Sequence, residues 1–117
     1  MPILVEPQSI VAEATKIQIK ALQDRLLKWV THPEEFVEEG LTPPTRETIE
    51  LAIQHVLKPL SESGRVPPSH VVPDAHGGIV FERRENGDFE SIHVHADGHI
   101  EFCVFHDGRL VDRQMWL

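Results

Sequence analysis

The last third of the chain alternates apolar and polar residues in short segments, and each segment ends at a glycine turn. Asn86-Gly87, Asp97-Gly98 and Asp107-Gly108 are dipeptides that close β-hairpins, because both residues tolerate positive φ. Alternation over about four to eight residues is typical of half-buried strands. The pattern therefore predicts an antiparallel meander with strands near 71–72, 78–84, 89–95, 99–105 and 109–116.

The lengths of these turns decide which side chains share a face of the sheet. A two-residue turn at Asn86-Gly87 pairs Phe81 with Ile92, and three-residue loops at 96–98 and 106–108 keep apolar residues opposite one another. The face that the helices should cover then comprises Ile79, Phe81, Ile92, Val94, Ile100, Phe102, Val104 and Leu110.

The first half of the chain has the three- and four-residue spacing of amphipathic helices. One helix is expected over 9–30, with Ser9 as its capping residue. A second helix begins at the Thr42–Thr45 start signal, and it ends or kinks near Leu57 because of Pro59. Between the two, residues 33–40 predict a short acidic helical turn with a solvated face.

The first helix is apolar over a wide arc. Its apolar positions include two rows, Ile10–Ala14–Ile17–Ala21 and Ile19–Leu22–Leu26–Trp29. A helix of this kind packs against more than one element, and the additional element belongs either to the same chain or to a second subunit.

Helices that precede strands, rather than alternate with them, indicate an α+β fold. We expect two main helices packed on one face of a four- to five-stranded antiparallel β-meander. The length of 117 residues fits a single domain. Within it, a linker at 65–70 separates a helical half, 1–64, from a β-meander half, 71–117.

The composition restricts the partners and the compartment. A net charge of −8 argues against a nucleic-acid partner, because phosphate binding needs a basic surface. The single cysteine, Cys103, excludes an intrachain disulfide and favours a reducing compartment. The start of the chain lacks the basic region of a signal peptide, and no apolar run approaches the ~20 residues of a membrane span. These features predict an acidic cytoplasmic protein without a membrane partner.

Histidines concentrate in the meander, with six of the eight in residues 70–117. The register puts His93, His95 and His99 on the outer face of the sheet, beside Glu101. Three imidazoles and a carboxylate resemble the ligands of zinc or another divalent metal. The competing interpretation is a polar outer face rich in histidine, because an open sheet lacks the groups that orient ligating imidazoles.

The segment that opens the meander resembles part of a known group of proteins. Pro73-Asp74 and Gly77–Glu82, followed by a turn and an Asp-Gly hairpin, are similar to a segment of small uncharacterised bacterial proteins with a helical first half. Their motif is Pro-Asp…Gly-Gly-Ile-x-x-Glu, and this chain has Arg83 where tryptophan is expected. The resemblance spans about residues 71–108. It implies no established activity, but an antitoxin-like arrangement beside a second small gene implies a protein partner.

Two functions follow as hypotheses. The first is a non-enzymatic protein-interaction module, homo-oligomeric and able to hold a protein partner. It is favoured by the wide apolar arc of the first helix, by the mixed outer sheet face and by the lack of a common catalytic motif, so no catalytic residue is predicted. The second is a divalent-metal-binding protein or metal-dependent enzyme that uses the set His93, His95, His99 and Glu101.

Overall fold

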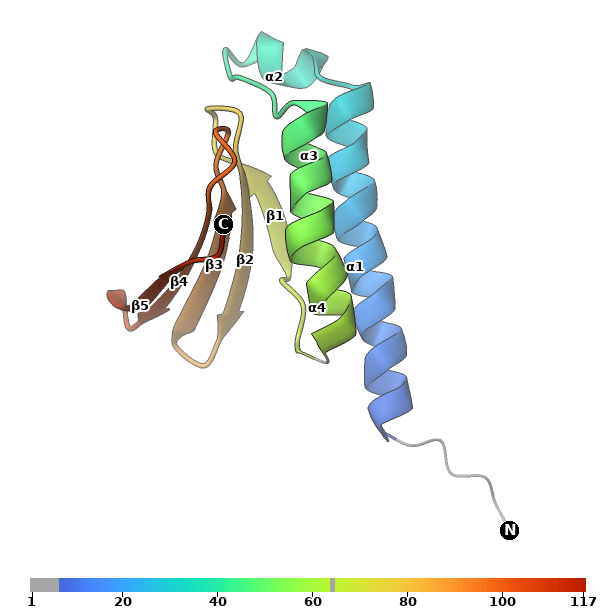
Figure 1. Cartoon of the computed structure of the whole chain (residues 1–117), viewed down its shortest axis with the longest axis vertical. Coiled ribbons are helices and arrows are strands. Elements are labelled where there is room, and N and C mark those ends of the chain that lie inside the picture. The colour runs from blue at the N-terminus through green and yellow to red at the C-terminus, as the bar shows by residue number, and fades with distance from the viewer. Residues whose placement is uncertain (1–6, 64) are drawn as a thin grey trace.

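The described part of the protein, residues 7–63 and 65–117 of a computed structural model, is built around a five-stranded antiparallel sheet (Figure 1). Each strand pairs with the next along the chain, in the order β1-β2-β3-β4-β5. The strands are β1 His70–Pro73, β2 Ile79–Glu85, β3 Asp88–Val94, β4 Ile100–His106 and β5 Arg109–Met115. The α+β class and the antiparallel meander are therefore confirmed.

The helical segments of the described residues precede the sheet. The predicted cap of the first helix, Ser9, lies outside the described side chains. The second helix is capped at its N-terminus by Thr45. The Thr45 hydroxyl accepts a hydrogen bond from the backbone N–H of Thr48 at 3.2 Å. Pro59 does not end this helix, because a wider π-turn lies directly before it and accommodates the missing backbone donor. The segments are α1 Pro7–Thr31, α2 Glu34–Glu38, α3 Arg46–Ala52, η1 Ile53–Leu57 and α4 Lys58–Ser63.

The helices form a layer beside the sheet. Figure 1 shows α1 alongside the continuous α3–η1–α4 segment, with β1 near this layer and β5 at the far side of the sheet. α1 contacts β1, and α3 contacts β2 and β3. No helix in the described ranges is both long enough and apolar enough to cross a lipid bilayer.

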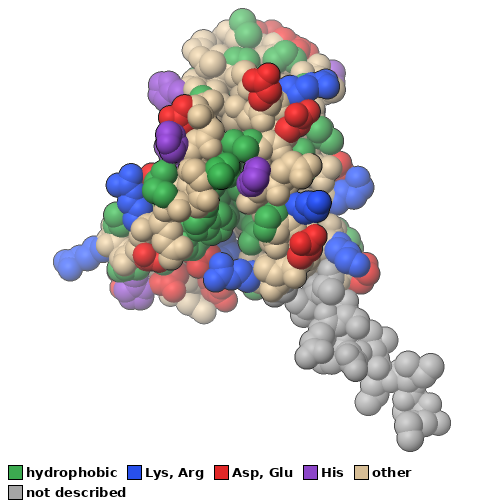
Figure 2. All heavy atoms as spheres, viewed as in Figure 1, with side chains coloured by type: hydrophobic (Ala, Val, Ile, Leu, Met, Phe, Trp, Pro, Cys, Tyr) green, Lys and Arg blue, Asp and Glu red, His purple; other side chains and the backbone are tan. Residues whose placement is uncertain are grey.

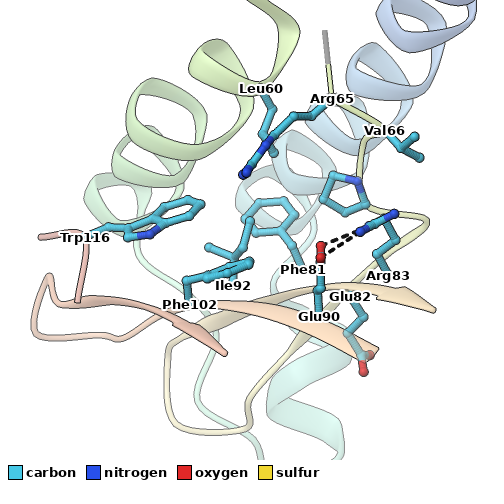
Figure 3. A pocket seen from close by; sticks show the side chains of 11 residues that line it. Leu60, Arg65, Val66, Phe81, Glu82, Arg83, Glu90, Ile92, Phe102 and Trp116 are labelled. Carbon is cyan, nitrogen blue, oxygen red and sulfur yellow. Dashed lines mark hydrogen bonds and ion pairs between the residues drawn. The ribbon is translucent and has the colours of Figure 1, made fainter. Parts of the chain in front are cut away.

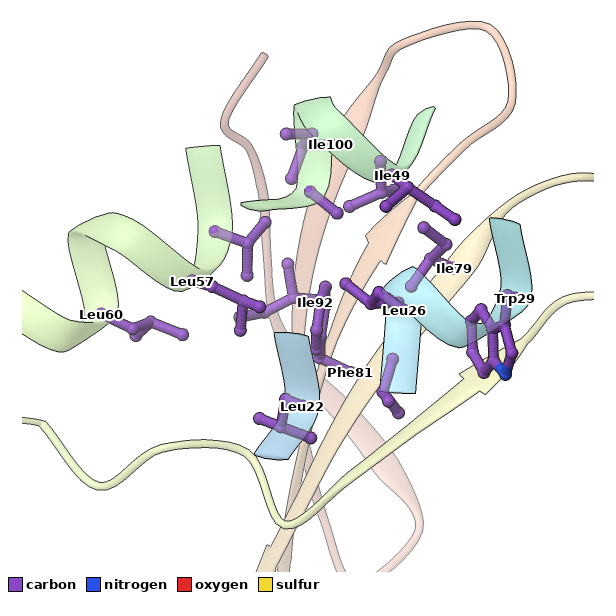
Figure 4. Packing of buried hydrophobic residues seen from close by; sticks show 14 of the residues in the cluster. Leu22, Leu26, Trp29, Ile49, Leu57, Leu60, Ile79, Phe81, Ile92 and Ile100 are labelled. Atoms are coloured by element: carbon purple, nitrogen blue, oxygen red, sulfur yellow. The ribbon is translucent and has the colours of Figure 1, made fainter. Parts of the chain in front are cut away.

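Buried side chains from both halves form a common core between the two layers (Figure 4). Leu26 of α1, Phe81 of β2 and Ile100 of β4 are at most 1% exposed. Of the two apolar rows on α1, the row Ile19–Leu22–Leu26–Trp29 lies in this core, whereas Ile17 of the other row is 70% exposed. The apolar arc of α1 is thus only partly covered within the chain.

Two of the three hairpins have the predicted register. Asn86 and Gly87 have φ values of 47° and 86°, as a type I′ turn requires, and Phe81 pairs with Ile92. In the second hairpin the backbone N–H of Gly98 donates to the carbonyl oxygen of His95 at 3.0 Å, which closes the predicted three-residue loop.

The third hairpin differs from the prediction, and the expected three-residue loop at 106–108 is wrong. Asp107 and Gly108 have φ values of 49° and 80°, so they alone form a type I′ turn and His106 pairs with Arg109. The imidazole of His106 also lies 2.6 Å from the carboxylate of Asp88 on β3, and this contact keeps His106 within the sheet.

A β-bulge in β5 follows from this shorter turn. Val104 pairs with Asp112 and Phe105 with Leu110, so Val111 has no opposite residue. Leu110 therefore lies beside Phe105, and its side chain is 52% exposed. The prediction that Leu110 lies in the core is wrong. The stabilisation from the turn and the register it sets is larger than the stabilisation from burying one leucine.

Candidate functional site

The carboxylate of Asp74 organises the turn between β1 and β2. Its side chain is only 14% exposed. Oδ1 accepts hydrogen bonds from the backbone N–H groups of His76 at 2.8 Å and Gly78 at 2.7 Å. Oδ2 accepts a hydrogen bond from Nε2–H of His93 at 2.7 Å. One carboxylate thus joins the turn to the strand β3.

Partial burial raises the pKa of Asp74, but hydrogen bonds outweigh this effect. The donors are His93 and the backbone amides of His76 and Gly78, and together they hold the pKa below its ordinary value. At neutral pH the group is therefore a charged acceptor with three donors around it.

The glycines after Asp74 make room for this arrangement. A β-carbon on Gly78 would lie 2.1 Å from Oδ2 of Asp74 and 2.8 Å from the carbonyl oxygen of Val94. Gly77 has a φ of 87°, a conformation that favours glycine. The Pro-Asp…Gly-Gly motif is therefore explained as a close-packed turn.

The structure brings together part of the predicted metal-ligand set. The rings of His93 and His95 stack with their centroids 3.8 Å apart, and Nε2 of His95 lies 3.9 Å from Oε2 of Glu101. His99 instead lies 2.9 Å from the carboxylate of Asp97. Within the described ranges, no group of three or more His, Cys, Asp or Glu side chains has an arrangement that could hold a metal ion. Metal binding by the set His93, His95, His99 and Glu101 stays a prediction.

Glu101 and Cys103 form a second polar group on the outer face. Sγ–H of Cys103 donates to Glu101 at 3.2 Å, and Arg113 of β5 donates to the same carboxylate at 2.9 Å. The hydrogen bond from Cys103, followed by that from Arg113, lowers the pKa of Glu101. Burial, followed by the hydrogen bond to Glu101, raises the pKa of Cys103, so the thiol stays protonated and is a poor nucleophile.

A groove lined by both apolar and charged side chains lies on the helix side of the sheet, between α4, the following linker and strands β2 to β4 (Figure 3). Its volume is about 180 Å³. The rings of Phe102 and Trp116 stack along one side, with centroids 5.1 Å apart. The Arg83–Glu90 ion pair, at 2.7 Å, lies on the opposite side, and the side chain of Arg65 extends over the opening.

The space-filling view shows the surroundings of this groove. Hydrophobic side chains gather in the hollow between the sheet layer and the helix layer (Figure 2). Positive and negative side chains are interspersed around it, so this face has no large patch of one sign. The groove is small compared with the roughly 300–1,000 Å³ of most small-molecule sites.

β5 and the two residues after it are the most exposed apolar part of the described chain. All seven residues of β5 are exposed, although the strand is hydrogen-bonded to β4. Ten large hydrophobic side chains in the described ranges are exposed, and five of them lie in this segment. They are Leu110, Val111, Met115, Trp116 and Leu117, with exposures of 37–60%.

β5 is also an edge strand, because the sheet of the described residues ends there. Free edges attract other strands, and proteins protect them with lysine, proline, charges or bulges. β5 has neither lysine nor proline. It carries three charged residues, Arg109, Asp112 and Arg113, and its bulge lies at Val111, in the first half of the strand. The second half therefore offers a regular edge to another strand.

No family model, curated protein or solved structure matches this chain. The candidate sites therefore depend on geometry alone. Asp74 is hydrogen-bonded to His93 and Glu101 to Arg113, whereas the outer edge of β5 has no neighbouring strand among the described residues.

Proposed function

We propose that this protein is a non-enzymatic protein-interaction module, homo-oligomeric and able to hold a protein partner. The observation that carries the proposal is the concentration of exposed apolar side chains on a single edge strand, 110–117. Exposed apolar side chains that gather on one element are typical of contact sites between proteins. The contact surface is β5 with the outer-face residues beside it, and a bound strand would extend the sheet.

The polar groups of the outer face have structural roles in this proposal. Asp74 holds the β1–β2 turn through His93, and Glu101 links β4 to β5 through Arg113. Both carboxylates lie in hydrogen bonds that stabilise the fold, which supports a binding role in preference to an enzymatic one. The single, protonated thiol of Cys103 suits the reducing conditions of the cytoplasm.

Met115→Lys is expected to weaken self-association at least about tenfold, because a buried aliphatic side chain contributes about 1.5–3 kcal/mol and lysine also blocks an edge. Met115 is 54% exposed, so the substitution should leave the monomer folded. The measurement is light scattering coupled to size-exclusion chromatography up to about 100 μM, since dimer populations depend on concentration.

The matched control is Val37→Lys, which places the same charge on α2, where Val37 is 67% exposed. This variant should associate like the wild-type protein. A wild-type protein that is monomeric throughout the concentration range would contradict the homo-oligomer, and equal association of both variants would exclude β5 as its surface.

A further inference from the structure

The free edge of β5 has a definite hydrogen-bonding pattern. The backbone N–H of Trp116 donates to the carbonyl oxygen of Ile100 on β4 at 2.8 Å. Backbone groups in an antiparallel strand point alternately to its two sides. The N–H and C=O groups of Gln114 therefore point toward β4, and those of Arg113 and Met115 point to the open edge.

The regular part of this edge is short. The bulge at Val111 interrupts the pairing of β5 with β4, and from Asp112 onward each residue has one opposite residue. Pairing continues to the Trp116–Ile100 hydrogen bond. The N–H of Ile100 donates to the carbonyl oxygen of Leu117 rather than of Trp116, so the segment with one-to-one pairing is 112–115, and Gln114 lies within it.

Charge limits how this segment can pair with a second copy of itself. In a symmetric antiparallel pair, the residue at the two-fold axis lies opposite its own copy. A two-fold axis at Asp112 or at Arg113 would place that residue opposite its own copy, so two like charges would face each other. An axis at Val111 would place Arg109 opposite the partner's Arg113. Like charges in this position are destabilising. Of the four centres from Val111 to Gln114, only Gln114 avoids the conflict.

We infer that the protein forms a dimer through antiparallel pairing of β5 with β5 of a second copy, with the two-fold axis at Gln114. This inference rests on the proposed function and names the partner and the register. Arg113 then lies opposite the partner's Met115 and Asp112 opposite the partner's Trp116. The outward groups of Arg113 and Met115 form about four backbone hydrogen bonds across the axis.

The two sheets become continuous in this dimer. Gln114 pairs with Phe102 on β4, which lines the helix-side groove, so Gln114 lies on the helix side of the sheet. A two-fold axis perpendicular to the sheet places the helix layers of both copies on the same side. The pair at the axis is not hydrogen-bonded through its backbone, and its Cα atoms are about 4.5 Å apart.

This geometry is suited to a cross-linking experiment. Two cysteines with Cα atoms about 4.4–6.8 Å apart can form a disulfide. Gln114→Cys in a Cys103→Ser background should therefore give a covalent dimer when the purified protein is oxidised with oxidised glutathione. The matched control is Asp112→Cys, because the Cα atoms of its two copies would lie about 14 Å apart in this register. The expected yield of covalent dimer from Gln114→Cys is at least about tenfold that from the control.

Each result bears on the inference. Preferential cross-linking of Gln114→Cys supports it, and equal or preferential cross-linking of Asp112→Cys overturns the register. A lack of cross-linking in a protein that light scattering shows to be dimeric overturns β5 pairing but leaves a homo-oligomeric interaction module whose contact surface is not the β5 edge, whereas a monomeric protein overturns the dimer and the homo-oligomer alike. If Cys103→Ser does not fold, Gln114→Cys in the natural background serves, because Cys103 is buried and only 8% exposed.

Discussion

Phe81→Ala is expected to lower the free energy of unfolding by about 3–5 kcal/mol, the usual effect of removing a buried aromatic ring from a core. Phe81 is 1% exposed and lies in β2 between Val71 of β1 and Ile92 of β3. Its removal would leave a cavity where the helix layer meets the centre of the sheet. Urea denaturation followed by circular dichroism measures the change.

The matched control for this change is Val80→Ala, one position earlier in the same strand. Val80 points to the outer face of the sheet, where it pairs with His93 and stays half-buried. Its replacement should cost less than about 1 kcal/mol, because little apolar area is lost. Equal losses for the two variants would contradict the assignment of the core face.

Asp74→Ala is the second change with a large expected effect, about 2–4 kcal/mol. The substitution removes a charged acceptor from three donors, two of which are backbone N–H groups in a close-packed turn. Thermal and urea denaturation of the variant at pH 7 measure the loss. The control is Asp97→Ala, because Asp97 also accepts from a backbone N–H two residues later but is 67% exposed.

The effect of Asp74 should depend on pH in a defined direction. Its pKa is lowered in the folded protein, so its contribution to stability is present above the unfolded pKa of about 3.9 and is lost as the pH falls through the folded pKa. The difference in unfolding free energy between the wild-type protein and Asp74→Asn should therefore shrink on acidification below about pH 4. A difference that grows with acid would contradict the lowered pKa, and a cost equal to that of Asp97→Ala would contradict the structural role.

Much of the sheet could be predicted from local sequence patterns. Asn86-Gly87 and Ala96–Gly98 fix the first two hairpins, because glycine and asparagine set the turn type and the apolar alternation sets the face. The same reasoning failed at 106–108, where either turn length fitted the pattern. The shorter turn is accompanied by a contact between His106 and Asp88 and by the bulge in β5. No local sequence pattern indicates that bulge.

The candidate sites were harder to predict. Asp74 and His93 are 19 residues apart, and their contact depends on how the β1–β2 turn folds over the sheet. The two glycines that follow Asp74 were the available signal. The exposed apolar residues of β5 could be predicted only in part. The alternation placed apolar side chains such as Val111 and Met115 on a mixed outer face, but the register error placed Leu110 in the core.

The central claim is that another strand pairs with the open edge of β5, and amide hydrogen exchange tests it most directly. The N–H groups of Arg113 and Met115 point to that edge, whereas that of Gln114 points to β4 and serves as an internal control. NMR-detected exchange should slow by about tenfold or more for Arg113 and Met115 as the concentration rises from about 10 to 500 μM, and it should stay slow for Gln114 throughout. Rapid exchange of Arg113 and Met115 at every concentration, beside slow exchange of Gln114, would contradict the claim.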